Sequence, residues 1–429
     1  MNDQVSESLP EYVGKYKVMR ELGRGSTCRV YLAQDPFAER EVAVKVLAPH
    51  LRGNPRENKR FLRAFQSEAS LAGRLKHPHI AAIFDAAMEG DHSYIVMEYV
   101  PGGTLQPYCH RDRLLSIDRV VEISFKCCRA LEYAMRQGVI HRDVKPANIL
   151  VTHGTEIKIT DFGTAFLSVA EYTQLTGVGS PAYMSPEQIQ ERELTHQTDI
   201  YSLGVVMYRL LTGRLPYTAR ETEKLMQEIL YVEPPPPSEH RPEIPPSIDR
   251  IVMRALCKDL DERYPTWTEF AKDLANVFSQ LQVSGEVADT SKFNALKQLP
   301  FFEKFEDSQI WEVLSLGIWR KVPKDTVLVR EGQAGDSLFI LVDGRVRVSR
   351  GNANLAELVP GDCFGLMLYF EESSRVRTTT VTTLATATAL ELKAPALLRA
   401  SETTQVQFNK AFLRILVHRL EQRPAAQNP

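Results

Sequence analysis

The chain has 429 residues, and its 52 Lys and Arg residues nearly balance its 54 Asp and Glu residues, which leaves a net charge of -2. At about 150 residues per domain, this length predicts two or three domains. The small net charge gives no indication of nucleic acid as a partner. A hydrophobic content of 43% is that of ordinary globular domains and excludes a disordered chain.

The sequence carries neither a membrane-spanning signal nor a secretory one. It has no uninterrupted run of about 18 apolar residues, and its polar first stretch lacks the basic and apolar regions of a signal peptide. The six cysteines are scattered, without the spacing of metal ligands. We therefore expect a cytoplasmic protein with reduced thiols, no membrane contact and a polar tail over residues 1–13.

A glycine-rich turn follows the first predicted strand, which begins at Tyr16. Gly23 and Gly25 lie in this turn, and Val30 belongs to the strand after it. Because glycine has no Cβ, such a turn allows backbone N–H groups to approach phosphate oxygens. The motif is weak evidence on its own, since a simple hairpin turn has the same composition.

Two charged residues follow on separate predicted elements. Residues 42–45 alternate like a strand that ends in Lys45, and the apolar periodicity of residues 61–75 predicts a helix that carries Glu68. Taken singly, each is more often a solvated surface charge. Further on, residues 94–100 predict a buried strand, and residues 117–137 predict a long amphipathic helix.

The segment after that helix gathers several polar groups suited to one kind of chemistry. Asp143, Lys145 and Asn148 lie within six residues, and Asp161 follows just before Phe162. The first carboxylate can orient the proton of a hydroxyl, and the lysine can stabilise a moving phosphoryl group. The amide and the second carboxylate offer the oxygen ligands that Mg²⁺ prefers. This set fits phosphoryl transfer, which depends on positioning and charge neutralisation.

With these motifs in place, the chain resembles the protein kinase superfamily over residues 14–282, and it looks most like a bacterial Ser/Thr kinase of the eukaryotic type. The resemblance implies ATP and Mg²⁺ as cofactors and protein substrates, including the chain itself. It makes Asp143 and Lys145 the catalytic residues and Asn148 and Asp161 the metal ligands. By the same resemblance, the nucleotide site comprises Leu22, Gly23, Gly25, Val30, Ala43, Lys45, Glu68, Glu98, Val100 and Leu150.

The resemblance also assigns contacts within this site. Lys45 is expected to pair with Glu68, and Met97 is expected to stand behind the adenine. Cys28 occupies the place of the family's third glycine. Cysteine is also small, so we expect a stiffer phosphate loop that still functions.

A loop rich in Thr and Ser, residues 163–180, follows Phe162. In the family, the arginine at the position of Arg142 pairs with a phosphate on this loop. Thr173 and Thr176 are the acceptors that we favour, followed by Thr164 and Ser168. Ser180 is expected to bond the catalytic residues. The alternative is a loop that is ordered without phosphate.

Two buried charges are expected to support the helical part. Asp199 lies inside an apolar helix and needs partners, which the family's pattern places in the catalytic-loop backbone. Arg263 is expected to pair with Glu187, which ends a Ser-Pro-Glu sequence where the family usually has Ala-Pro-Glu. The proline-rich run at 233–246 suggests either a linker or an SH3-type ligand, and we favour the simpler linker.

Residues 283–294 form a polar stretch that we predict to be a linker, and the pattern of predicted elements changes after it. Helices are expected over residues 296–317, and a closing helix over residues 396–420. Short strands are predicted at 326–329, 338–342, 346–349, 355–359 and 381–392. Many short strands at even spacing favour a jelly-roll barrel.

The glycine-containing turns of this region resemble the cyclic-nucleotide-binding (CRP-like) domain over residues 295–421. The fold class predicted for the whole chain is therefore α+β, a bilobal protein kinase fold followed by a small β jelly-roll barrel with flanking helices. The resemblance implies that Gly365 and an arginine contact a cyclic phosphate. Arg377 fits that arginine by its following strand, and Arg375 fits it by distance along the chain; we favour Arg377.

The ligand of the barrel stays open at this stage. Leu366 stands where the family has a ribose-binding glutamate, and Glu371 or Glu372 could replace that glutamate only in a rebuilt loop. Losing a charged hydrogen bond costs about 1.5–3 kcal/mol, or one to two decades of affinity. The open possibilities are a weak or altered cyclic-nucleotide site, another small ligand, and an interaction module that makes a homodimer.

Two other functions compete with that of an active kinase. A pseudokinase scaffold predicts that Lys45, Asp143, Asn148 or Asp161 is missing, and all four are present. A cyclic-nucleotide-responsive transcription factor is disfavoured, because we expect no helix-turn-helix after the closing helix.

Overall fold

The computed structural model describes residues 9–25, 28–47, 74–87, 93–152, 154–162, 181–281, 289–365, 376–398 and 400–421. The chain divides into two compact units, Met1–Gly285 and Glu286–Pro429. Among the helices of these ranges, none is long and apolar enough to cross a membrane.

The first unit begins with an antiparallel sheet whose strand order is β1-β2-β3-β4-β6-β5. Its strands are β1 (Tyr12–Val13), β2 (Tyr16–Arg24), β3 (Cys28–Asp35), β4 (Arg40–Leu47), β5 (Ile83–Ala87) and β6 (Tyr94–Glu98). Side chains alternate between the two faces, as the period of a strand requires. Val42 and Val44 of β4 belong to one buried cluster, whereas Ala43 between them belongs to another on the opposite face.

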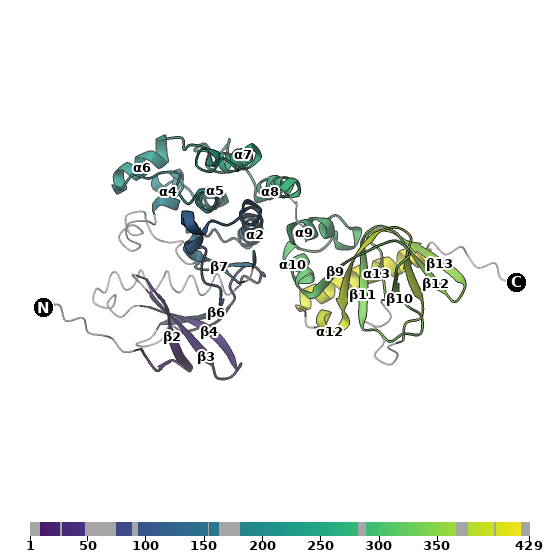
Figure 1. Cartoon of the computed structure of the whole chain (residues 1–429). Helices are drawn as coiled ribbons and strands as arrows, with labels where there is room; N and C mark the ends of the chain where they lie inside the picture. The colour runs from purple at the N-terminus through teal and green to yellow at the C-terminus, as the bar shows by residue number, and fades with distance from the viewer. Residues whose placement is uncertain are drawn as a thin grey trace. The chain divides into compact units, whose positions relative to one another are not determined.

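The rest of the first unit is mainly helical (Figure 1). Its helices are α2 (Ile117–Arg136), α4 (Pro186–Ile189), α5 (His196–Thr212), α6 (Thr222–Tyr231), α7 (Pro246–Ala255) and α8 (Trp267–Leu281), and its hairpin is β7 (Ile149–Val151) with β8 (Ile157–Ile159). Short 3-10 turns are η2 (Gln106–Cys109), η3 (Arg111–Arg113), η4 (Pro146–Asn148), η5 (Pro181–Tyr183) and η6 (Pro237–Glu239). Figure 1 shows the sheet in one lobe and α5 to α8 in the other.

Helix α5 is the buried axis of the helical lobe. It starts after Thr195, whose side chain accepts from the N–H of Gln197, and it ends at Gly213, whose φ of 71° suits a residue without a Cβ. Leu210 and Leu211 near its end are fully buried. The prediction of a long helix over 117–137 is confirmed by α2. Pro234 and Pro237 are buried in this lobe, which disfavours an SH3-type ligand.

The second unit contains two four-stranded sheets, ordered β10-β15-β12-β13 and β14-β11-β16-β9. The strands are β9 (Gly317–Val322), β10 (Val327–Val329), β11 (Ser337–Asp343), β12 (Val346–Arg350), β13 (Ala353–Leu358), β14 (Cys363–Phe364), β15 (Thr380–Thr383) and β16 (Ala387–Lys393). Phe339 from one sheet and Val346 and Val381 from the other meet in one buried cluster. This is the arrangement expected of a jelly-roll.

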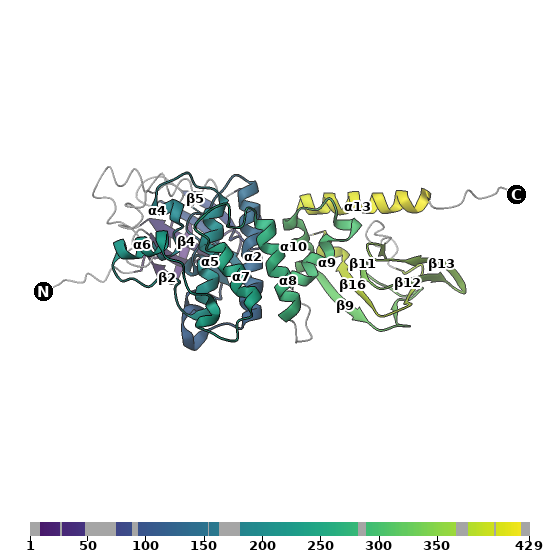
Figure 2. The same cartoon turned by 90° about the horizontal axis from the view of Figure 1, so that it is seen from above.

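Helices flank this barrel (Figure 2). They are α9 (Asp289–Lys297), α10 (Asp307–Leu316), α12 (Ala394–Leu397) and α13 (Glu402–Glu421), with η7 (Pro300–Phe302) between the first two. The side chains of Ser401 and Thr404, at the start of α13, donate to Glu312 of α10 at 2.7 and 2.6 Å. Phe301 and Phe408 pack edge to face, with ring centroids 5.4 Å apart.

Several details of the second unit differ from the prediction, including β9, which no predicted strand covers. Helix α9 begins at Asp289, inside the stretch predicted as a linker, because Phe293 is fully buried and anchors it. The single strand predicted at 381–392 is two strands, β15 and β16, separated by a turn. The predicted closing helix is also two helices, α12 and α13, with Ser401 between them accepting from the N–H of Thr404.

Candidate active site

Asp199 of α5 holds the catalytic loop through hydrogen bonds to its backbone. Its two carboxylate oxygens accept from the backbone N–H groups of His141, at 2.8 Å, and Arg142, at 2.7 Å. Arg142 has a φ of 64°, a left-handed conformation that costs a non-glycine residue about 1–2 kcal/mol. Burial raises the pKa of Asp199, whereas the charges and hydrogen bonds of His141 and Arg142 lower it. The predicted supporting contacts of Asp199 are confirmed.

His141 locks the loop to the segment that carries Asp161. Its Nε2 lies 2.9 Å from the carbonyl oxygen of Thr160, and its Nδ1 accepts from the N–H of Asp143 at 3.2 Å. The neutral tautomer with a proton on Nε2 satisfies both contacts. The fully buried ring also packs against Phe162, with centroids 4.5 Å apart.

Asp143, Lys145 and Asn148 form a compact cluster in this loop. Lys145 Nζ lies 2.8 Å from Asp143 Oδ2. Asn148 Nδ2 donates to the carbonyl oxygen of Asp143 at 2.9 Å and to its Oδ2 at 3.0 Å. The amide nitrogen of Asn148 is therefore engaged, which leaves its Oδ1 as the oxygen that can face a cation.

Lys45 and Asp161 meet across the two lobes. Lys45 Nζ donates to Asp161 Oδ1 at 2.7 Å, although the residues are 116 positions apart in sequence. The lysine side chain is 14% exposed and the aspartate side chain 31%. Asp161 has a φ of 65° and follows Thr160, whose N–H donates to the carbonyl oxygen of Asn148 at 3.0 Å. This bond places the two candidate Mg²⁺ ligands side by side.

Apolar side chains from the sheet form a surface next to these charges. Ala43 of β4 is directly opposite both Leu32 and Met97 in the sheet. Ala43 and Met97 belong to one cluster against which Leu22 and Val30 pack. The hydroxyl of Thr160 donates to the sulfur of Met97 at 3.7 Å. The predicted nucleotide-facing residues of the sheet are thus brought together.

The segment after β6 links the two lobes at the edge of this surface. The N–H of Glu98 donates to the carbonyl oxygen of Ala82 at 2.8 Å, and its carboxylate lies 2.9 Å from Lys158 Nζ. Val100 is buried, yet its N–H makes no hydrogen bond within the ranges that the structure describes. A buried N–H without a partner suits a ligand with an acceptor edge.

Leu150 of β7 lies on the helical-lobe side of the same region, bridged to Thr104. Gly102 approaches β7 so closely that a Cβ on it would overlap the carbonyl oxygen of Val151 and lie 2.7 Å from that of Thr152. Glycine is therefore required here for steric reasons.

The helical lobe is closed by an ion pair between Arg263 and Glu187, as predicted. Arg263 Nη1 and Nη2 donate to the two carboxylate oxygens at 2.8 and 3.2 Å. Arg263 is fully buried and Glu187 is 4% exposed. Burial opposes the charge on Glu187, but the hydrogen bonds and charge of Arg263 outweigh it and lower the pKa of this carboxyl.

Some predicted site residues lie outside the described ranges. They are Glu68, Thr173, Thr176, Ser180, Leu366 and Arg375. The Lys45–Glu68 pair, the phosphorylated loop and the ribose contact therefore stay predictions.

Arg377, the favoured phosphate arginine of the second unit, is half-buried. A Cβ on Gly335 would lie 2.6 Å from Arg377 Nη2, and one on Gly365 would lie 2.7 Å from Nη1. Nη1 is buried and has no hydrogen-bond partner among the residues that the structure describes. Burial lowers the pKa of this guanidinium, against the opposing effect of Asp336. A cradle of two glycines around an unsatisfied guanidinium fits an anionic ligand.

Two supporting residues were missed from sequence. Gln188 Nε2 donates to the carbonyl oxygen of Arg142 at 2.9 Å, and Gln188 also forms a capping box with Ser185. The Ser-x-x-Gln spacing could have revealed the cap, although not the contact with the loop. Lys158, which bonds Glu98, gave no signal in its local pattern.

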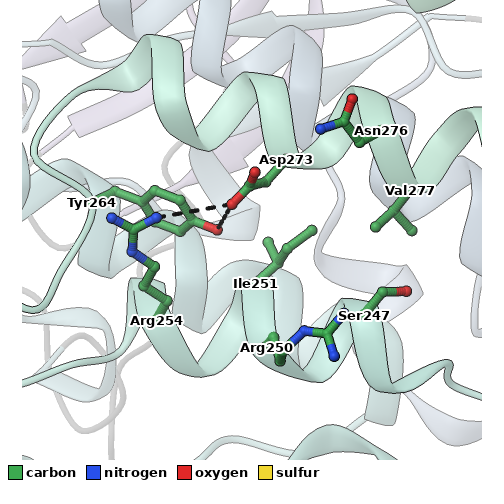
Figure 3. A pocket seen from close by; sticks show the side chains of 8 residues that line it. All are labelled: Ser247, Arg250, Ile251, Arg254, Tyr264, Asp273, Asn276 and Val277. Carbon is green, nitrogen blue, oxygen red and sulfur yellow. Dashed lines mark hydrogen bonds and ion pairs between the residues drawn. The ribbon is translucent and has the colours of Figure 1, made fainter.

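A separate surface pocket of about 370 Å³ lies between α7 and α8 (Figure 3). The side chains of Arg254 and Tyr264 point toward Asp273, at 3.9 and 2.9 Å. These contacts satisfy the charges locally. Within the described part of the chain, no group of three or more His, Cys, Asp or Glu side chains could hold a metal ion.

Comparison with known families places this architecture. The protein kinase domain matches residues 16–274, and the cyclic nucleotide-binding domain matches residues 319–404. The first match covers more than half of the chain, so the chain belongs to the protein kinase family. The predicted fold class and the predicted resemblance to both families are confirmed.

Similar curated proteins are bacterial kinases. The chain is 38% identical over 267 residues to the serine/threonine-protein kinase PrkC of Bacillus subtilis, which covers 62% of this chain and 41% of the relative. It is 36% identical over 272 residues to PknB of Mycobacterium tuberculosis, covering 61% of this chain and 43% of that protein. The chain thus spans about two fifths of the length of these relatives.

Proposed function

We propose that the chain is a Ser/Thr protein kinase that transfers the γ-phosphoryl group of ATP to protein hydroxyls, including its own. The observation that carries this proposal is that Asp143, Lys145 and Asn148 lie together in one loop. A backbone hydrogen bond joins Asn148 of this loop to Thr160, and the next residue, Asp161, contacts Lys45. These groups supply a base, two cations and two oxygen ligands, which is the set that phosphoryl transfer requires.

In this proposal each side chain has a separate task. The carboxylate of Asp143 orients the attacking hydroxyl and accepts its proton. Lys145, 2.8 Å away, stabilises the transferred group, and Lys45 binds phosphate oxygens. Asn148 Oδ1 and Asp161 would hold Mg²⁺, which neutralises charge on the phosphates when bound.

The apolar surface accounts for the nucleotide base. Ala43, Leu22 and Val30 would cover one face of the adenine, and Leu150 the other. The buried N–H of Val100 would donate to its acceptor edge. Gly23 and Gly25 would allow the backbone of the turn to approach the phosphates.

The test is transfer of radiolabelled phosphate from ATP with Mg²⁺ to a general protein substrate and to the chain itself. Labelling by the full chain that Asp143→Ala abolishes is the expected result. Absence of labelling under every condition would contradict the proposal and favour the pseudokinase scaffold.

We also propose that residues 14–282 form the kinase domain, and that the barrel of residues 295–421 regulates it by binding an anionic ligand such as a cyclic nucleotide. The support is the unsatisfied Nη1 of Arg377 between Gly335 and Gly365. Homodimerisation through this domain is a further part of the expectation from sequence.

The ligand is tested by titrating the full chain with cAMP and with cGMP in a calorimeter. Binding that Arg377→Gln removes and that Arg347→Gln keeps would support the site. Arg347 is the matched control, because its side chain is 44% exposed and lies 3.9 Å from Glu357 on the barrel surface. No heat with either nucleotide would rule out cyclic nucleotides as the ligand.

A further inference from the structure

A pocket of about 680 Å³ lies on the helical lobe, beside the segment that follows the Thr- and Ser-rich loop. Pro181 and Ala182 of η5 form one side of it, and Leu225 of α6 lies on another. Arg209, near the end of α5, also lines the pocket. The cavity is therefore built from three separate elements of the fold.

The lining of this pocket is strongly basic. Arg209, Arg214 and Arg220 all line it, and none of the described residues that line it is acidic. No ion pair is formed by these three arginines within the described ranges. Unpaired arginines around one cavity create a positive potential that favours a carboxylate.

The nearby acidic side chains are engaged elsewhere. Glu228 Oε2 accepts from the N–H groups of Thr218 and Ala219, at 3.1 and 3.2 Å, and so fixes the loop that carries Arg220. Glu221 lies 3.0 Å from Lys224. Within the described ranges neither Glu228 nor Glu221 forms an ion pair with the three arginines, so the lining itself keeps its positive charge.

The pocket is connected to the catalytic loop through α5. Arg209 Nη1 donates to the hydroxyl of Tyr183, and the hydroxyl of Ser202 donates to the carbonyl oxygen of Tyr183 at 2.8 Å. Asp199, which holds the catalytic loop, lies ten positions before Arg209 on the same helix. Ten helical residues span about 15 Å, and an extended peptide covers that length in about five residues.

We infer that this pocket binds a carboxylate side chain of the protein substrate, within about five residues of the phosphorylated hydroxyl. The inference rests on the proposed kinase function and adds a substrate class, acidic Ser- or Thr-containing segments. Arg214 and Arg220 provide the charge at the rim, and Arg209 provides it at the wall next to η5.

The test compares peptides that carry one Ser in a neutral sequence, with Glu or Gln placed in turn at each position up to five residues on either side. Glu and Gln have the same shape, so the ratio of their kcat/KM values with the full chain isolates the charge. We expect the Glu peptide to be favoured about fivefold or more at one or two positions.

The double variant Arg214→Gln, Arg220→Gln should bring this ratio close to one. Arg250→Gln is the matched control, because Arg250 is an exposed arginine of α7 that lines the separate pocket of Figure 3, and the ratio should stay as in the wild type. The preference should also weaken as salt is added.

Two outcomes would overturn the inference separately from the proposed function. Turnover of the Gln peptides with a ratio of one at every position would remove the acidic preference and leave the kinase in place. If no peptide is phosphorylated, fluorescence anisotropy of a labelled Glu peptide tests whether the pocket binds it. Binding that the double variant loses would support it, and equal binding by wild type and double variant would refute it.

Discussion

Replacement of Arg263 by methionine should destabilise the first unit severely. The arginine is fully buried and donates five hydrogen bonds, two to Glu187 and three to the backbone carbonyl oxygens of Gln197, Cys257 and Lys258. Methionine keeps much of the volume but leaves the Glu187 carboxylate buried without its cation. Breaking a buried pair in this way costs about 3–5 kcal/mol in the free energy of unfolding.

The pH dependence of this loss has a definite sign. In the wild type the pKa of Glu187 is lowered below 4.5, so its contribution is present above that pH and is lost as the pH falls through the folded pKa. In Arg263→Met the buried carboxylate has no cation, and burial raises its pKa instead. The penalty then disappears on protonation. The difference in the free energy of unfolding between wild type and variant should therefore narrow as the pH falls from neutral toward the ordinary carboxyl pKa of 4.5.

The assay is urea unfolding followed by tryptophan fluorescence. Trp267 is 1% exposed in the first unit, and replacing Trp311 and Trp319 by Phe confines the signal to it. The matched control is Arg254→Met, because Arg254 is 40% exposed beside Glu269, and its loss should cost about 1 kcal/mol. A cost for Arg263→Met within about 1 kcal/mol of this control, or a gap that is constant with pH, would refute the reasoning.

Three further predictions concern other positions of the first unit. Asp199→Asn replaces one of two acceptor oxygens by a donor, so one catalytic-loop N–H loses its partner. We expect the free energy of unfolding in urea to fall by about 1–3 kcal/mol. The kcat should also fall by a larger factor than in any exposed Asp→Asn variant. Gly102→Ala forces the segment away from Val151, and the KM for ATP should rise by about tenfold in steady-state assays, with an unchanged KM contradicting the steric argument. Burial lowers the pKa of Lys258 to about 8, so between about pH 8 and pH 10 the unfolded chain binds more protons than the folded chain. The wild type should therefore gain stability relative to Lys258→Met as the pH rises over this range. The midpoints of urea unfolding measure this difference.

The sequence predicted best those features that repeat locally. The 3.6-residue period predicted α2 to within one residue of its observed end, and short runs between glycine-containing turns predicted β11 and β12. The motif residues Asp143, Lys145 and Asn148 lie within six positions, so their clustering follows from a single turn.

Contacts between distant segments were harder to predict. The ion pair between Lys45 and Asp161 was not predicted, because the two residues lie 116 positions apart. The predicted Lys45–Glu68 pair involves a residue outside the described ranges and stays a prediction. A single sequence offers no period or spacing that links a strand of one lobe to a loop of the other. The division of residues 381–392 into two strands was missed for a related reason. The sequence of this stretch is compatible with one continuous strand, and the two strands differ in their pairing partners, which are β12 for β15 and β11 for β16.

The buried polar groups explain why the catalytic loop can hold an unfavourable backbone. Arg142 and Asp161 both have positive φ values, of 64° and 65°, and each such residue costs about 1–2 kcal/mol. Asp199 offsets the first cost with two short hydrogen bonds to backbone N–H groups, and Lys45 offsets the second with its ion pair. The first partner lies in the mostly buried helix α5, whereas the second comes from the other lobe. The helical lobe alone therefore holds the conformation of Arg142, whereas that of Asp161 depends on contact with the sheet. A ligand that draws Lys45 away from Asp161 should change the backbone conformation of Asp161 and leave that of Arg142 unchanged.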